Sequence, residues 1–389
     1  MRKSLLLAGA VALAAVYATA ASAADPIKIG VIAAYSGQFA DTAAQIDNGI
    51  KLYMKQHGDT VAGRKIEIIR KDTGGPNPDA AKRLAQELVV RDKVDILAGF
   101  TLTPEALGAA GVATEAKKFM VDMNAATSIV TEKSPYIVRV SLTLPQVSST
   151  IGHWAATKGG AKKAYTMVSD YGPGLDGEKW FQKAFKDAGG EIVGSVRMPV
   201  ANADFSAFVQ RAKDLNPEAI FVFVPGGAQP AALGKAFAER GMDAKKIKIF
   251  STGEAVDEAA LKAMGDIALG RLSGWHYDYT LKSKTNDAFV KAFNAMFKRN
   301  PDFFAVGGYD GMHVIYEALK KTKGKTDGDA LVNVAKGMKW ESPRGPIMID
   351  PATRDIVQNI YMRKVEKVDG HLVNVVIDTV KDVKDPTHK

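Results

Sequence analysis

The sequence predicts an α/β protein with two lobes, each built from a mostly parallel sheet flanked by helices. The first observation is that apolar runs of strand length alternate with amphipathic stretches of helix length, which is typical of parallel sheets. The second is that this alternation restarts after a polar segment, residues 141–145, that ends in proline. The third is that later segments return to the first lobe and leave it again. We therefore expect three crossings between two lobes, with a hinged cleft between them.

The first lobe begins with an apolar run at residues 27–33, followed by a helix at residues 42–56. Further strands are expected at residues 65–70, 95–98, 119–123 and 136–140, with helices at residues 79–91 and from Pro104 onward. Proline suits the first turn of a helix, because the amide hydrogen that it lacks would have no partner there. Each strand is thus expected to be followed by a helix that returns the chain to the start of the next strand.

The same alternation builds the second lobe. Its expected helices are residues 147–158, 177–188, 205–215 and 231–240, and its expected strands are residues 164–169, 192–198, 219–224 and 248–250. A second crossing at residues 272–279 leads to three helices without strands between them, residues 286–297, 306–320 and 329–338, which should pack on the first sheet. After residue 346 strands return, with a hairpin turn at residues 368–370. We expect residues 24–142 plus 278–338 in lobe 1, and residues 143–277 plus 339–389 in lobe 2.

The first 23 residues read as a secretory signal peptide. Arg2 and Lys3 precede an apolar run at residues 5–16, and Ala21-Ser22-Ala23 fits a cleavage site. The run is shorter than the roughly 20 residues that a membrane-spanning helix needs, which disfavours the alternative of an anchor. The chain has no cysteine, so it can form no disulfide and carries no acceptor for a bacterial lipid anchor. We expect a free, monomeric protein in the periplasm.

The net charge of +9 raises the question of an anionic partner. Lysine and arginine are spread among aspartate and glutamate, and the densest basic run, residues 320–325, lies beside two acidic residues. Basic stretches interleaved with aromatic residues, which would indicate a nucleic-acid surface, are missing from the sequence. A solvated basic surface is the better interpretation, and no nucleic-acid partner is expected.

The motifs of common enzymes are weak or missing. Residues 172–177 match the dinucleotide pattern G-x-G-x-x-G, but Pro173 stiffens the turn and the next strand lacks the acid that would hold a ribose. No two of the six histidines are three or four residues apart, and a G-x-S-x-G elbow is missing. We therefore expect no catalysis, no cofactor and no metal. A nucleotide-dependent oxidoreductase remains a less favoured alternative.

Several loops that follow expected strands carry side chains suited to a small organic acid. Hydroxyls and backbone amides suit a carboxylate, aromatic rings suit an apolar body, and a single acid suits an ammonium or a phenol hydroxyl. The carboxyl ends of parallel strands meet at one edge of a sheet, where open α/β folds bind ligands. The residues concerned are Tyr35, Ser36, Asp41, Thr42, Phe100, Thr101, Thr103, Ala125 and Thr127 in the first lobe, and Tyr171, Gly227, Ala228, Gln229 and Glu254 in the second.

These loops resemble those of type I periplasmic solute-binding proteins, in the leucine/isoleucine/valine-binding family of ABC importers. The motifs that carry the resemblance are Ala34-Tyr35-Ser36-Gly37, residues 99–103, Asn124-Ala125-Ala126-Thr127, Ser169-Asp170-Tyr171-Gly172 and residues 250–256. The resemblance covers essentially the whole chain after the signal peptide. It implies that the two lobes close on a solute and deliver it to a membrane permease. A periplasmic ligand sensor on the same fold is the alternative.

The resemblance also implies roles for single residues. Thr103 stands where the family binds the ligand carboxylate, and Thr101 is the next choice. The turn that holds the same carboxylate is expected to include Ala125, Ala126 and Thr127. From the second lobe Tyr171 is expected to close over the ligand, Glu254 to take an ammonium or a hydroxyl, and Gly227 and Ala228 to line the pocket. Tyr35, Ser36, Phe100 and Phe304 are expected to line it from the first lobe.

Departures from the family pattern leave the ligand class open. Gln38 stands where amino-acid binders often have proline, and Ala228 replaces an aromatic residue of the site, which would enlarge the pocket. Tyr35, Phe100 and Tyr171 would keep that pocket aromatic. We therefore hold two ligand classes, a branched-chain or other hydrophobic amino acid and an aromatic carboxylate such as a benzoate or cinnamate derivative.

Overall fold

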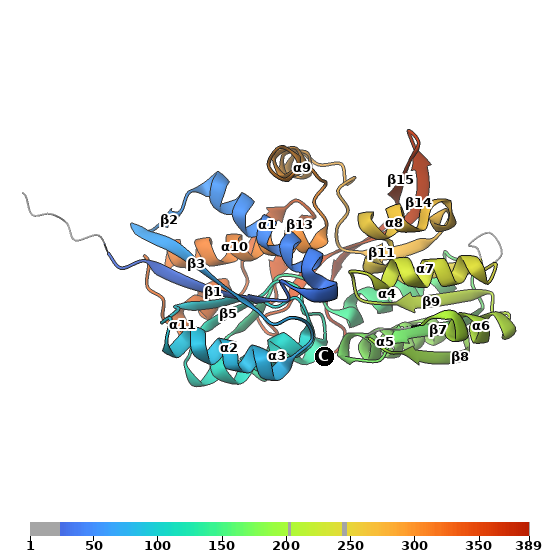
Figure 1. The fold of residues 1–389 in the computed structure, drawn as a ribbon, viewed down its shortest axis with the longest axis horizontal. Coiled ribbons are helices and arrows are strands. Elements are labelled where there is room, and N and C mark those ends of the chain that lie inside the picture. The colour runs from blue at the N-terminus through green and yellow to red at the C-terminus, as the bar shows by residue number, and fades with distance from the viewer. Residues whose placement is uncertain (1–23, 201–203, 243–246, 389) are drawn as a thin grey trace, which may run out of the picture.

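The computed structural model describes residues 24–200, 204–242 and 247–388, and it shows two α/β lobes side by side (Figure 1). The expected signal peptide, residues 1–23, lies outside the described residues. Each lobe has its own sheet with helices on its faces, so the predicted fold class is confirmed. Within the described residues, none of the helices combines the length and the apolar character that crossing a bilayer requires.

The first lobe contains a six-stranded sheet. In spatial order its strands are β2 (Thr60–Val61), β3 (Arg64–Asp72), β1 (Ile27–Ala33), β4 (Ile96–Gly99), β5 (Phe119–Asp122) and β6 (Ile137–Arg139). All neighbours pair in parallel except β2, which forms a short antiparallel hairpin with β3. β1 is buried along almost its whole length, as expected for a parallel strand that is covered on both faces.

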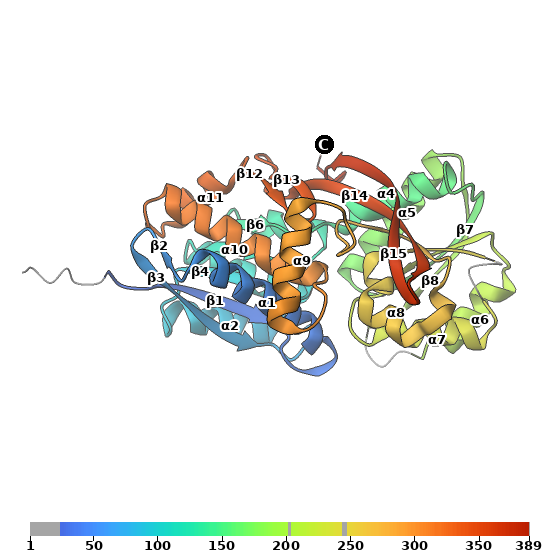
Figure 2. The ribbon, with the colours of Figure 1, turned by 90° about the horizontal axis from the view of Figure 1, so that it is seen from above.

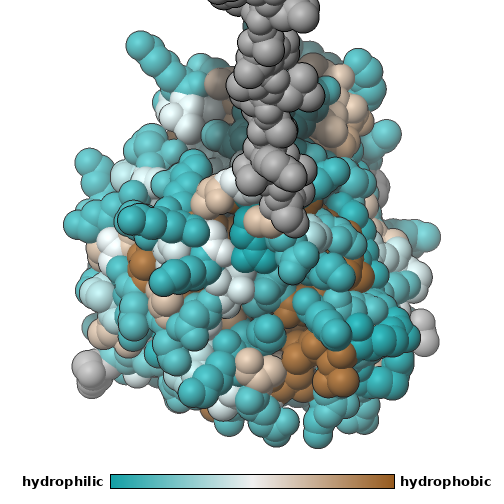
Figure 3. Space-filling model, turned by 90° about the vertical axis from the view of Figure 1, so that its left-hand side faces the viewer, coloured by the Kyte–Doolittle hydropathy of each residue, from teal (hydrophilic) through white to brown (hydrophobic). Residues whose placement is uncertain are grey.

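Helices from distant parts of the sequence cover this sheet. They are α1 (Ala40–His57), α2 (Pro78–Val90), α3 (Thr103–Glu115), α9 (Lys284–Phe297), α10 (Phe303–Lys321) and α11 (Gly328–Ala335). Figure 1 shows α2 and α3 on one face and α1 with α10 on the other. The three late helices therefore do pack on the first lobe, as the lack of strands between them indicated. The end of this lobe farthest from the second lobe is mostly hydrophilic (Figure 3), which agrees with a solvated surface.

A mixed sheet of nine strands forms the second lobe and continues through β14 to the hairpin of β12 and β13. In spatial order these are β12 (Lys339–Ser342), β13 (Gly345–Ile349), β14 (Ile356–Val368), β11 (Leu272–Trp275), β10 (Lys248–Thr252), β9 (Ala219–Phe223), β7 (Lys163–Ser169) and β8 (Glu191–Met198), with β15 (His371–Val383) paired to β14. The strands from β11 to β8 are parallel to one another, whereas β14 runs antiparallel to β11. The expected hairpin turn joins β14 to β15, with positive φ at Asp369 and Gly370.

The helices of the second lobe follow its strands. They are α4 (Leu144–Ala156), α5 (Gly172–Asp187), α6 (Ser206–Asp214), α7 (Gln229–Glu239) and α8 (Glu258–Met264). Short 3-10 turns stand where loops enter or leave elements, at η1 (Gly37–Phe39), η2 (Ser128–Lys133), η3 (Gly253–Val256) and η4 (Gly265–Ala268). Two of these turns, η2 and η3, follow strands whose carboxyl ends point toward the other lobe.

Three segments cross between the lobes, as predicted. The first runs from β6 into α4, where the Thr143 hydroxyl accepts a hydrogen bond from the Gln146 amide and so caps the helix. The second runs from β11 into α9, which the Ser283 hydroxyl caps in the same way. The third is β14 itself, which pairs with β13 at its start and with β11 and β15 farther along (Figure 2).

The hairpin of β12 and β13 lies against the first lobe rather than the second. Trp340 Nε1 donates to Asp310 Oδ1 of α10 at 2.9 Å, and the Trp340 ring stacks on His313. Ser342 Oγ donates to the other oxygen of Asp310 at 2.8 Å. We therefore propose that the last boundary, expected at residue 339, lies within β14. The remaining lobe boundaries stay predictions.

Candidate functional site

The loops at the carboxyl ends of strands from both sheets face one another across the interface between the lobes, and the lobes touch there. The backbone amide of Ser128, at the start of η2, donates to Asp176 Oδ2 of α5 at 3.0 Å. Asn300 Nδ2 of the first lobe donates to Glu258 Oε1 of α8 at 3.1 Å. Gly227 lies so close to the Gln38 carbonyl that a Cβ atom could not be added there. The structure is thus that of a closed clamp.

Two hydroxyls expected to hold a carboxylate lie together in the first lobe. The Oγ1 atoms of Thr103 and Thr127 are 2.9 Å apart, and the Thr127 amide donates to Thr103 Oγ1 at 3.3 Å. Both residues are buried. A Cβ atom placed on Gly172, the first residue of α5, would lie 2.7 Å from Thr127 Oγ1. The second lobe therefore covers this pair of hydroxyls directly.

Thr101, Ala125 and Ala126 hold the loops of the first lobe together. Thr101 Oγ1 accepts a hydrogen bond from the Ala34 amide at 3.0 Å, and the Ala126 carbonyl accepts one from Leu144 at 2.9 Å. The Ala125 amide, which we expected to bind the ligand carboxylate, donates instead to Asp122 Oδ1 at 2.8 Å. That expectation needs correction, because the side chain of Asp122 already satisfies the amide.

Three other expected site residues point elsewhere. Phe100 is fully buried, but its ring belongs to the core cluster under α2 and α3, and its backbone turns through a positive φ of 68°. Ser36 is exposed, and its amide donates to Asp72. Ala228 is exposed at the start of α7, so its small side chain does not enlarge a buried pocket. These residues adjoin the site in sequence, while their side chains take other directions.

Glu254 is the most unusual group at the interface. It is 7% exposed, and its Oε2 atom has no hydrogen-bond partner among the described residues. Burial, with a smaller contribution from Asp257, raises the pKa of Glu254 well above its ordinary value. The Glu254 charge in turn contributes, after burial, to the raised pKa of Tyr171, whose ring stacks on Phe223. Glu254 and Tyr171 are therefore close, as predicted.

Aromatic rings from both lobes pack against glycines of the interface loops. Gly253, next to Glu254, packs directly on the ring of Trp275, which meets Phe303 edge to face with ring centres 4.9 Å apart. A Cβ atom on Gly226 would lie 2.9 Å from the ring of Phe304, which is 2% exposed. The interface between the lobes is thus lined by rings and packed through glycines.

Two aromatic donors differ in their surroundings. The Trp275 indole nitrogen has no hydrogen-bond partner within the part of the chain that the structure describes, whereas the Tyr35 hydroxyl lies beside Arg70. Burial, followed by the charge of Asp47, raises the pKa of Tyr35, so its hydroxyl keeps its proton. We had predicted Tyr35 for the site but had missed Trp275. Its only signal was its place at the end of β11, inside the expected second crossing.

The G-x-G-x-x-G pattern has a structural explanation. Residues 172–177 form the first turns of α5 rather than a loop before it, and Gly174 sits so close to the Ser169 carbonyl that no side chain fits. Gly172 makes the close contact with Thr127 described above. These glycines bring a helix against a strand end and against the other lobe, and the pattern alone indicates no nucleotide.

Comparison with known proteins decides the family. A model of the periplasmic binding protein family matches residues 26–370. The chain belongs to this family. A curated relative, the Leu/Ile/Val-binding protein homolog 6 of Brucella melitensis biotype 1, is 44% identical over 378 residues, which are 96% of each chain.

Solved structures of ABC transporter solute-binding proteins resemble this chain over nearly its whole length. A solute-binding protein of an ABC transporter from Rhodopseudomonas palustris BisB5, in complex with 3,4-dihydroxybenzoic acid, is 55% identical with a TM-score of 0.90, covering 94% of this chain and 99% of that chain. One from Rhodopseudomonas palustris HaA2, in complex with p-hydroxybenzoic acid, is 43% identical with a TM-score of 0.91 and the same coverage. The predicted membership and fold are therefore confirmed.

Membership settles the class of function. This family consists of solute-binding proteins that work with ABC transporter permeases, and it is not a family of enzymes. It also implies a periplasmic location. The chain accordingly belongs to a family of solute-binding proteins.

Proposed function

We propose that this protein captures a hydroxybenzoate-type aromatic carboxylate between its lobes and delivers it unchanged to an ABC permease. Two relatives support this ligand class, since those at 55% and 43% identity hold dihydroxybenzoic and hydroxybenzoic acid. Relatives at 44% identity are named for leucine, isoleucine and valine, which keeps an amino acid as the second candidate. We further propose that the protein acts as a monomer without a lipid anchor, after removal of residues 1–23.

The observation that carries the proposal is the buried Oε2 atom of Glu254, which has no hydrogen-bond partner among the described residues. Burial raises the pKa of Glu254 well above its ordinary value, so the site disfavours the ionised form of this acid. A phenol hydroxyl can donate to the free Oε2 atom whether the acid is neutral or ionised. An ammonium group could form a full ion pair with Glu254 only after this acid had lost its proton inside a desolvated site. An aromatic hydroxyl is thus the better fit.

The other end of the ligand would lie at the hydroxyl pair. Thr103 and Thr127 can each turn a hydroxyl toward a carboxylate once their mutual hydrogen bond opens. The rings of Tyr171, Trp275 and Phe304 would enclose the aromatic body. Since the pair and Gly172 belong to different lobes, a ligand held here favours the closed state over an open one.

Two substitutions at Glu254 separate the ligand classes. Glu254→Gln keeps an oxygen acceptor for a phenol but removes the negative charge that an ammonium needs. Glu254→Leu removes both. We expect calorimetry to show 4-hydroxybenzoate binding within about tenfold of wild type for Glu254→Gln, and weakened about 10- to 100-fold for Glu254→Leu, the effect of one lost buried hydrogen bond. Benzoate, which lacks the hydroxyl, should bind both variants alike.

The control is Glu115→Gln, at an exposed residue of α3, which should bind like wild type. The proposal fails if leucine binds the wild type and 4-hydroxybenzoate does not. It also fails if Glu254→Leu keeps full affinity for 4-hydroxybenzoate.

A further inference from the structure

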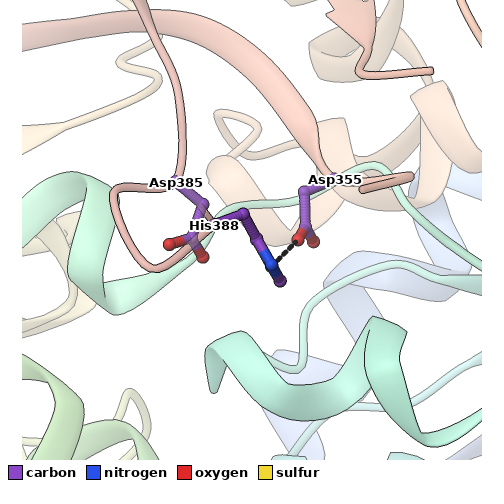
Figure 4. Close-up of side chains that lie close together, drawn as sticks. All are labelled: Asp355, Asp385 and His388. Atoms are coloured by element: carbon purple, nitrogen blue, oxygen red, sulfur yellow. Dashed lines mark ion pairs between the residues drawn. The ribbon is translucent and has the colours of Figure 1, made fainter. Parts of the chain in front are cut away.

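A second group of polar side chains lies beside η2, where the segment after β15 returns to the first lobe (Figure 4). Asp355 precedes β14, and Asp385 and His388 belong to that returning segment. One potential ligand atom from each residue lies within 4.8 Å of the other two. His388 Nε2 is 3.3 Å from Asp355 Oδ2. Both aspartates are buried, and His388 is partly so.

The surrounding protein holds one side of each group in place. Asp355 Oδ2 accepts a hydrogen bond from Thr131 Oγ1 at 3.1 Å, while its other oxygen faces Arg139 Nε at 3.2 Å. Asp385 Oδ1 accepts from the Thr387 amide at 2.8 Å. His388 Nδ1 lies 3.6 Å from Glu132 Oε1. These contacts hold the three side chains in place, with one potential ligand atom of each within 4.8 Å of the others.

Asp385 Oδ2 shows that a positive partner is missing from these contacts. Asp385 is 7% exposed, and this oxygen has no hydrogen-bond partner among the described residues. Protonation of His388 would not supply one, because its two ring nitrogens already face Glu132 and Asp355. A buried carboxylate oxygen without a donor is costly. A cation between the three side chains would remove that cost.

We propose that Asp355, Asp385 and His388 bind a divalent transition-metal ion, with Zn²⁺ as the best match. Two ligands about 2.0–2.1 Å from a tetrahedral zinc are about 3.3 Å apart, which is the separation of His388 Nε2 and Asp355 Oδ2. A carboxylate on the far nitrogen of a ligating histidine, as Glu132 is placed here, is the usual outer partner of such a ligand. Two carboxylates and one imidazole leave a fourth position for water.

The ion would fasten the segment after β15 to the first lobe. Asp355 also faces Arg139, whose Nη2 atom donates to the Thr127 carbonyl at 2.8 Å. One side chain thus connects the metal site to the loop that carries the hydroxyl pair. This inference does not rest on the identity of the solute, and its test uses no solute.

The test uses the untagged protein through Lys389 after removal of metals with a chelator. Titration with ZnCl₂ followed by calorimetry should give one zinc per chain and a rise in melting temperature. Asp385→Asn and His388→Gln should each abolish that binding, while His153→Gln, at an exposed histidine of α4, should keep it. Co²⁺ should give wild-type protein the visible absorption of a tetrahedral site, which needs no variant to fold.

The proposal is overturned if zinc binds with the same stoichiometry and affinity to both ligand variants. It is also overturned if wild-type protein binds no zinc and shows no tetrahedral Co²⁺ spectrum.

Discussion

Gly172→Ala tests whether the lobes close on one another as the structure shows. Gly172 begins α5 in the second lobe, and Thr127 lies in the first. An alanine Cβ atom at residue 172 would lie 2.7 Å from Thr127 Oγ1. Ordinary contacts of this kind begin near 3.4 Å, so the lobes would have to separate or the threonine would have to turn away from Thr103. Only the closed state contains this clash.

The size of the effect follows from the cost of overpacking. One added methyl group in a filled space costs about 1–3 kcal/mol. Because the open state does not contain the clash, this cost raises the free energy of the closed state alone. It therefore raises the dissociation constant of the solute. At about 1.4 kcal/mol per factor of ten, affinity should fall about 5- to 150-fold. The melting temperature of the protein without solute should stay near that of wild type.

The assay is calorimetric titration with the solute identified in the binding screen, combined with thermal unfolding without solute. Gly111→Ala is a matched control, because Gly111 is an exposed residue of α3 and an added Cβ atom meets nothing within 4 Å. It should leave affinity unchanged. Wild-type affinity for Gly172→Ala would refute the closed arrangement. A large drop in melting temperature without solute would instead place the clash within the fold.

Two further predictions concern buried charges. Asp310→Asn should lower the free energy of unfolding by about 3–5 kcal/mol in chemical denaturation, because it leaves the buried Arg344, 3.0 Å away, without its charged partner; an unchanged midpoint would contradict this. Burial raises the pKa of Glu105 to about 8. The stability that its protonated form contributes is therefore fully present below pH 4.5 and is lost as the pH rises through 8. Glu105→Gln should flatten the fall in the free energy of unfolding between about pH 5 and 8, and an unaltered dependence on pH would contradict this prediction.

Much of the fold could be predicted from the sequence because its signals are local. Apolar runs such as β1 and proline-started helices such as α3 depend on neighbours in the chain, and their order implies a parallel sheet. The crossings were predictable for a related reason, since α9 to α11 have no strands of their own to pack on. The position of β12 and β13 beside α10 was not predicted, because it depends on hydrogen bonds to Asp310 from residues about 30 positions away in sequence.

The site was harder to predict than the fold. Sequence order shows which residues follow the strands, and Thr103, Thr127, Tyr171 and Glu254 are predicted for the site on that basis. Which way a loop side chain points depends on backbone angles that sequence does not reveal. Phe100 turns into the core through its positive φ. The cluster of Asp355, Asp385 and His388 was missed because its members meet only after β15 has returned along β14.

The crossings themselves explain why this hinge has a defined geometry. Each is held by a buried arginine paired with an aspartate: Arg139 with Asp122 and Asp355, Arg344 with Asp310, and Arg363 with Asp278. Irregular backbone at a crossing leaves carbonyl groups without strand partners, and a guanidinium group offers five donors.

These arginines satisfy carbonyl groups of the crossings themselves. Arg344 donates to the carbonyls of Val140 and Ser141 in the first crossing, and Arg363 donates to that of Tyr277 in the second. Buried ion pairs add little net stability, but they disfavour arrangements in which either charge loses its partner. We therefore expect motions of the lobes about the crossings to keep these pairs intact.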